Sequence, residues 1–173
     1  GEPLWACACP HCARAFSQAY GEPMPARFGP DVSRFRQESL QRWLAFGMRA
    51  ARERGLANSL CLLPVEDARY GIGPWEQVAQ EPALDSLGTD PYWVPFPDGF
   101  ARAFRAQEGR PAGLEDLVRY FARKVVGIAR AAGKRPHLWI QGFRIPAGGE
   151  AHLDRAAAVA WEAGIRDLAV WAD

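Results

Sequence analysis

The chain has 173 residues, enough for one domain with a buried core, and its 21 basic and 20 acidic residues leave a formal net charge of +1. This balance argues against a nucleic-acid-binding surface, which usually carries a marked basic excess. No apolar run is long enough for a membrane span and no signal peptide opens the sequence, so we expect no membrane partner. A thiol cluster of the metal-binding kind favours a reducing compartment, and we predict a cytoplasmic location.

Hydrophobic periodicity predicts helices that alternate with strands. Apolar residues at helical spacing predict helices at 31–55, near 74–80, at 98–106 within a long connection, at 114–132 and at 150–163. Apolar runs predict strands at 59–64, 83–88, 137–143 and 167–171. The first run, which contains Cys61, is typical of a strand buried on both faces. The Gly- and Pro-rich stretch 16–30 is typical of an irregular connection.

Four strands that alternate with amphipathic helices are typical of βα units and of a parallel sheet. Ligands bind at the carboxyl ends of strands in such folds, and polar residues follow or end each predicted strand. These residues are Glu66, Asp90, Gln141 and Asp173. No Gly-rich phosphate loop joins a strand to a helix, which disfavours a dinucleotide-binding fold.

Three cysteines near the start of the chain, Cys7, Cys9 and Cys12, form the motif that we call the cysteine cluster. The C-x-C-x-x-C spacing can turn three thiolates toward one point, which suits a soft tetrahedral ion such as Zn²⁺. Redox or disulfide use and inert thiols are the alternatives. A closed zinc site needs a fourth ligand, which the sequence does not supply clearly. His11 lies between two ligands and would strain the loop, and Cys61 belongs to an apolar strand.

The cluster and its surroundings resemble the zinc loop of family 42 β-galactosidases, which are TIM-barrel glycoside hydrolases. In that family a catalytic glutamate ends the fourth barrel strand, and a C-x-C-x-x-C loop follows that continues to a phenylalanine and a Tyr-Gly pair. Here Glu2 precedes the cluster, and Phe16 and Tyr20-Gly21 follow it. The resemblance implies that the chain is the C-terminal half of a (β/α)8 barrel, with the fifth to eighth strands. It also implies a structural Zn²⁺ whose fourth ligand comes from an earlier part of the barrel.

The resemblance further implies hydrolysis of a carbohydrate by two carboxyl groups. Glu2 would be the general acid, and Asp90 or Asp173 the general base of an inverting mechanism. The family's nucleophile is a glutamate on the seventh strand, where this sequence has Gln141, and an amide cannot take that role. A sugar-binding protein without catalysis, or a zinc-stabilised interaction protein, is therefore the alternative. Asp90 can also be a turn-forming residue before a proline.

Aromatic and polar residues near strand ends are candidates for sugar binding, because rings stack on pyranose faces and polar groups bind hydroxyls. The candidate rings are Trp5, Tyr92, Trp93, Trp139 and Trp171, and the candidate hydroxyl-binding groups are Gln141 and Arg144. Trp139 and Trp171 are equally compatible with a core position. We expect His137 and His152 to face solvent or to cap helices.

Half a barrel leaves two open sheet edges and an uncovered inner face. We therefore expect this domain, residues 1–173, to be completed by an N-terminal half or by another copy of the chain.

Overall fold

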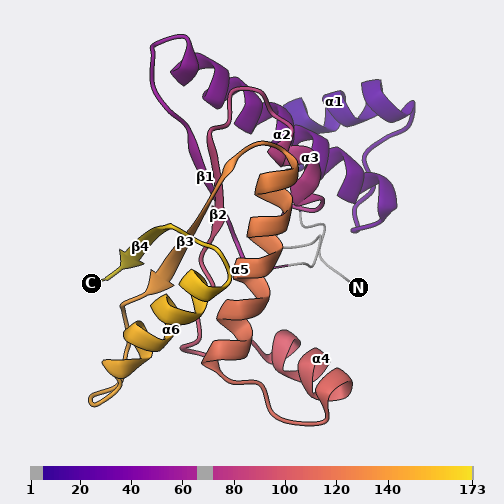
Figure 1. Cartoon of the computed structure of the whole chain (residues 1–173). Helices are drawn as coiled ribbons and strands as arrows, with labels where there is room; N and C mark the ends of the chain where they lie inside the picture. Colours follow the sequence, from indigo (N-terminus) through magenta and orange to yellow (C-terminus); the bar gives the residue numbers. More distant parts are fainter. Residues whose placement is uncertain (1–5, 66–71, 173) are drawn as a thin grey trace.

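The computed structural model describes residues 6–65 and 72–172 (Figure 1). The predictions for Glu2, Trp5, Glu66 and Asp173 lie outside these residues. The helices are α1 (Pro10–Tyr20), α2 (Pro30–Arg52), α3 (Trp75–Ala79), α4 (Asp98–Glu108), α5 (Leu114–Ala131) and α6 (Ala151–Glu162). The strands are β1 (Ser59–Leu62), β2 (Ser86–Thr89), β3 (Arg135–Gln141) and β4 (Asp167–Trp171).

The four strands form one sheet in the order β1-β2-β3-β4, and every neighbouring pair is parallel. Helices connect the successive strands, so the predicted α/β class and the alternating βα units are confirmed. A sheet of this order, with consecutive strands side by side, is compatible with half of a barrel.

The hydrophobic core lies between one face of the sheet and the helices α5 and α6 (Figure 1). Leu87 of β2 and Leu138 of β3 point to this face and are completely buried. They meet the apolar stripe of α5, in which Leu117, Val118 and Val125 are also completely buried. Helix α5 forms here because its apolar residues recur at helical spacing and Asp116 accepts a hydrogen bond from the backbone N–H of Gly113 at its start (2.9 Å).

We call the other face of the sheet the open face. Side chains alternate along a strand, so the neighbours of the core-facing residues point to it. The open face comprises Ser59, Cys61, Ser86, Gly88, Arg135, His137, Trp139, Gln141, Asp167, Ala169 and Trp171. Cys61 and Trp171 are exposed on it. The prediction that the first strand is buried on both faces is therefore wrong, because no described element covers this side of β1.

A helical hairpin of α1 and α2 has a small core of its own, made by Phe16, Val32 and Phe35. The rings of Phe16 and Phe35 meet edge to face, with centroids 5.4 Å apart. Helix α1 begins with Pro10 at its first position and ends at Gly21, whose φ of 76° is the left-handed conformation of a helix end. The prediction of irregular structure from residue 16 is thus wrong up to Tyr20, and the hairpin fixes the segment that carries the cysteine cluster.

Candidate functional site

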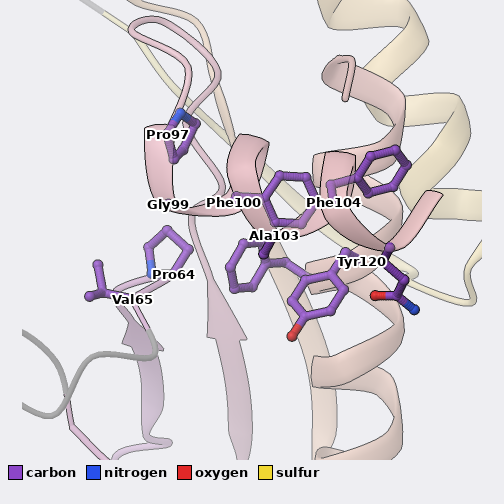
Figure 2. A pocket seen from close by; sticks show the side chains of 10 residues that line it. Pro64, Val65, Pro97, Gly99, Phe100, Ala103, Phe104 and Tyr120 are labelled. Atoms are coloured by element: carbon purple, nitrogen blue, oxygen red, sulfur yellow. The ribbon is translucent and has the colours of Figure 1, made fainter. Parts of the chain in front are cut away.

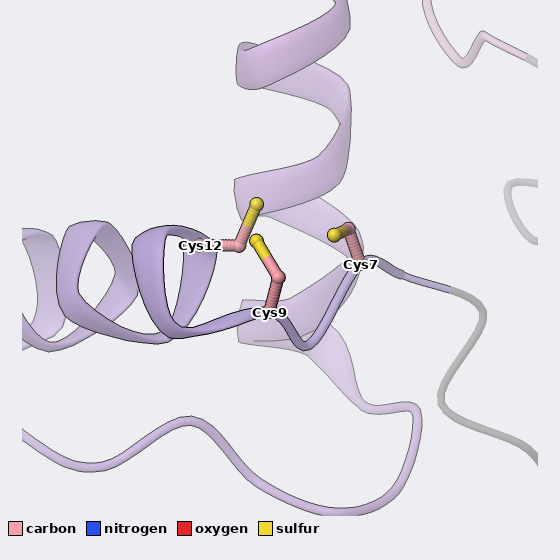
Figure 3. A group of neighbouring side chains, drawn as sticks. All are labelled: Cys7, Cys9 and Cys12. Carbon is pink, nitrogen blue, oxygen red and sulfur yellow. The ribbon is translucent and has the colours of Figure 1, made fainter.

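The three thiols of the cysteine cluster converge at the beginning of α1 (Figure 3). Their sulfur atoms all lie within 4.8 Å of one another. Three thiolates around one Zn²⁺ would lie about 3.8 Å apart, given Zn–S bonds of about 2.3 Å. The observed spread is close to that value, so the three cysteines could bind a metal ion. Among the described residues, no fourth His, Cys, Asp or Glu joins this group.

The pKa values of two thiols of the cluster shift in opposite directions. The pKa of Cys9 is lowered to about 7, chiefly because the backbone N–H of Cys12 in the first turn of α1 stabilises the thiolate. The pKa of Cys12 is raised to about 11, chiefly because of its hydrogen bonds with the thiols of Cys7 and Cys9. The cluster therefore already holds one thiol that is easily deprotonated.

Asp90 directly follows β2 and lies at the carboxyl end of the sheet. Side chains alternate along an extended chain, so Asp90, two residues after Gly88, also lies on the open face. The carboxyl oxygen Oδ1 is buried and has no hydrogen-bond partner. Burial raises the pKa of Asp90, although a hydrogen bond with Tyr92 opposes part of this shift. This shift favours the protonated form, which is the state that a general acid requires.

Two groups next to Asp90 share its environment. Tyr92 is half-buried, and burial together with its hydrogen bond to Asp90 raises the pKa of its hydroxyl. The ring of Tyr92 meets that of Phe143 edge to face, with centroids 5.0 Å apart. The pKa of the Cys61 thiol is raised to about 12 by burial and by the nearby Asp90 charge, although its side chain as a whole is exposed. This shift favours the thiol of Cys61 over the nucleophilic thiolate.

The predicted sugar-binding rings divide into two groups. Trp139 and Trp171 lie side by side on the open face, with ring centroids 5.8 Å apart. Trp139 is half-buried and Trp171 is 54% exposed, so their rings remain accessible for stacking. Trp93, by contrast, is buried within the hydrophobic core. Its predicted role as a stacking platform is wrong, because its ring is already packed.

Gln141 has a structural role that uses both ends of its amide. The side chain is completely buried, and Oε1 accepts hydrogen bonds from the backbone N–H groups of Trp93 (2.7 Å) and Val94 (2.9 Å). The amide nitrogen Nε2 donates to the backbone carbonyls of Val94 (2.8 Å) and Phe143 (3.1 Å). The predicted binding of a sugar hydroxyl is therefore wrong, because no donor or acceptor of this amide is left over.

Arg144 is exposed just after β3, with a φ of 54° that is unusual for a residue other than glycine. Asp90 and Tyr92 follow β2, and Trp139 and Trp171 lie on β3 and β4, so all four belong to the carboxyl-terminal part of the sheet.

His137 is a residue that the sequence-based reasoning placed in solvent and that is in fact buried on the open face. Its Nδ1 lies 2.7 Å from Ser86 Oγ and 3.4 Å from Ser59 Oγ. The space for its ring comes from Gly88, where an added Cβ would lie 2.2 Å from the imidazole. Desolvation lowers the pKa of His137, which keeps the ring neutral. The glycine inside strand β2 was the available signal for this close approach.

An apolar cavity of about 440 Å³ lies between α4, α5 and the residues that follow β1 (Figure 2). Phe100, Phe104 and Tyr120 line one side of it, and Pro64 and Val65 line the other. None of the predicted site residues that the structure describes lines this cavity.

Within the described residues, none of the helices combines the length and the apolar character that a bilayer crossing requires. Comparison with protein-family models, with curated proteins and with solved structures finds no match for this chain.

Proposed function

We propose that this chain is part of a TIM-barrel glycoside hydrolase, similar to family 42, that cleaves a carbohydrate by carboxylate chemistry at the carboxyl ends of its strands. The parallel sheet with alternating helices supports the barrel. The observation that carries the proposal is Asp90, a carboxyl group at a strand end with a buried, unpaired oxygen and a raised pKa.

The direction of the Asp90 pKa shift bears on its role in the reaction. A glycosidase acid must hold a proton near neutral pH and deliver it to the glycosidic oxygen. Burial favours the protonated form of Asp90, so the acid role suits it better than the base role. Glu2 or Asp173 would then be the second carboxyl group.

Stacking and metal binding complete the proposal. The adjacent rings of Trp139 and Trp171 offer a surface for the apolar face of a pyranose. We assign Zn²⁺ as the ion of the cysteine cluster, because three thiolates at this separation match its preferred ligands. The zinc loop would hold the segment that carries Glu2.

The test is hydrolysis of a panel of 4-nitrophenyl glycosides by the chain and by the Asp90→Asn variant. We expect the variant to lose at least about 100-fold in kcat/KM, the usual contribution of a general acid. Tyr92→Phe should move the basic limb of the pH–rate profile to higher pH, because the hydrogen bond that it removes lowers the pKa of Asp90. Asp167→Asn is the matched control, because Asp167 is exposed at the amino end of β4. Equal rates for the wild type and Asp90→Asn would refute the proposal.

A second candidate is sugar binding without cleavage, and Gln141 favours it. This residue occupies the strand on which the family has its nucleophile, and its amide is committed to the loop at 93–94. Quenching of tryptophan fluorescence by sugars, lost in Trp139→Ala and without hydrolysis of any glycoside in the panel, would support this candidate.

A further inference from the structure

Two of the three cysteines of the cluster lie where a disulfide can form, in the first turn of α1. Cys9 is the N-cap residue of the helix, and its carbonyl accepts a helical hydrogen bond from the backbone N–H of Ala13 (2.9 Å). Cys12 follows three residues later, and a helical rise of about 1.5 Å per residue places the two Cα atoms about 5 Å apart. Disulfides usually join Cα atoms that are about 4.4–6.8 Å apart. The helix itself therefore holds this pair within reach of a disulfide.

The side chains support the same pairing. The sulfur atoms of Cys9 and Cys12 are turned toward each other at the helix start (Figure 3), and both belong to the group of three that lies within 4.8 Å. Cys7 precedes the helix, so helical hydrogen bonds do not fix its distance from either of the other two. Cys9 and Cys12 are therefore the pair that the fold prepares for a disulfide, and Cys7 is the third thiol beside it.

The two thiols differ in their surroundings in the way that an exchange reaction requires. Within the described residues, Cys9 is exposed between two small exposed residues, Ala8 and Pro10, so another disulfide can reach its sulfur. Cys12 is half-buried and packs against the small core of the α1–α2 hairpin, which holds it in place. An accessible thiol with a second thiol poised next to it is the arrangement of redox-active cysteine pairs.

The charge of the surrounding segment indicates which kind of disulfide can approach. Between Glu2 and Glu22 the sequence has no acidic residue, and Arg14 is its only formal charge. The backbone N–H groups at the start of α1 add partial positive charge next to the cluster. A small disulfide that carries carboxylates, such as oxidised glutathione, therefore meets no like charge from this segment.

We propose that Cys9 and Cys12 form a redox-active dithiol that exchanges with small anionic disulfides, and that its oxidation abolishes metal binding by the cysteine cluster. The sulfur of Cys9 attacks one sulfur of the small disulfide, which releases the first small thiol and leaves a mixed disulfide on Cys9. The sulfur of Cys12 then attacks the sulfur of Cys9 and releases the second small thiol. Two electrons pass from the cysteine pair to the small disulfide, and the two cysteine protons end on the two released thiols.

The disulfide and metal binding exclude each other, because both need the same sulfur atoms. A metal ion at the cluster would lose two of the three ligands that the described residues offer when Cys9 joins Cys12, and reduction would restore them. This consequence rests on the zinc site of the proposed function. Formation of the disulfide depends neither on zinc nor on the carbohydrate chemistry.

The test exposes the reduced, metal-free chain to mixtures of reduced and oxidised glutathione, alkylates the remaining thiols and maps the peptides by mass spectrometry. We expect a disulfide between Cys9 and Cys12, with Cys7 and Cys61 alkylated. Cys12→Ser should instead accumulate glutathione on Cys9, because the second attack is lost, and Cys9→Ser should lose the disulfide. Cys61→Ser is the matched control, since it removes an exposed cysteine outside the cluster and should leave the reaction unchanged.

Loss of the fold does not explain the expected results. Serine is a favoured N-cap residue, so Cys9→Ser should preserve α1, and circular dichroism establishes that each variant keeps its helices. A wild-type chain that stays reduced, that stops at the mixed disulfide or that joins Cys7 to another cysteine would overturn the proposal.

The effect on the metal is measured with the zinc-loaded chain and a chromogenic chelator that records released zinc. We expect oxidised glutathione to release the zinc from the wild type and from Cys61→Ser, and a reductant to restore binding. An oxidised chain that retains its zinc would refute the exclusion of the metal. A chain that binds no zinc but forms the disulfide between Cys9 and Cys12 refutes the zinc site of the proposed function and leaves the dithiol.

Discussion

Replacement of Gln141 by leucine tests the role that the structure gives this residue. Leucine has a similar size and no polar atoms, so it removes four hydrogen bonds without opening a large cavity. The N–H of Trp93, which is buried, and that of Val94, which is half-buried, would lose their partner. A buried donor without a partner costs about 1–3 kcal/mol, so we expect a loss of about 3 kcal/mol in the free energy of unfolding.

The assay is urea unfolding, monitored by circular dichroism. The free energy of unfolding should depend on the urea concentration with the same slope in both proteins. Gln18→Leu is the control, because Gln18 is exposed on α1 and its replacement should change the free energy of unfolding by less than about 0.5 kcal/mol. If Gln141→Leu costs less than about 1 kcal/mol, the amide does not hold the loop. The residue would then be available again for a ligand.

Three further predictions concern other parts of the chain. Gly88→Ala should destabilise the fold by about 2–3 kcal/mol in urea unfolding, because its Cβ would lie 2.2 Å from the His137 ring, and adding His137→Ala should recover most of this loss. The pKa of Asp85 is lowered by the backbone N–H of Asn58 (2.7 Å) and by Arg52, so its contribution to stability is present above the unfolded-state pKa and is lost as the pH falls. In thermal melts, the melting temperature should therefore fall less between pH 7 and pH 3 for Asp85→Asn than for the wild type. Elemental analysis should find one zinc per chain, which replacement of the cysteine cluster by serine removes and Cys61→Ser retains; no zinc in the wild type would contradict the assignment.

Local patterns in the sequence are sufficient to predict most of the elements. Helices α2, α5 and α6 and strand β3 differ from their predicted ranges by three residues at most at either end, because each carries a clear apolar period or run. Helix α1 was missed over residues 16–20, since the glycines and prolines after Tyr20 dominate that window. The signals that were available are Pro10 at the first helical position and Gly21 at the end.

The arrangement of the candidate site also depends partly on local sequence and partly on contacts between residues that are far apart in the chain. Three cysteines within six residues must lie close together, so their convergence follows from spacing alone. The role of Gln141 does not, because its partners at Trp93 and Val94 lie 48 and 47 residues earlier in the chain. The burial of His137 depends likewise on Ser86 and on the space left by Gly88, both on another strand.

The open face changes character along the strands, as the interior of the proposed barrel would. At the amino ends, His137 is buried and within hydrogen-bond distance of Ser86, which suits a packed floor. At the carboxyl ends lie a carboxyl group with an unpaired oxygen, Asp90, and the accessible rings of Trp139 and Trp171. Barrel enzymes separate stability and chemistry in this order, with the site at the carboxyl ends. A substitution at Gly88 should therefore change stability before activity, and Asp90→Asn should change activity with little effect on stability.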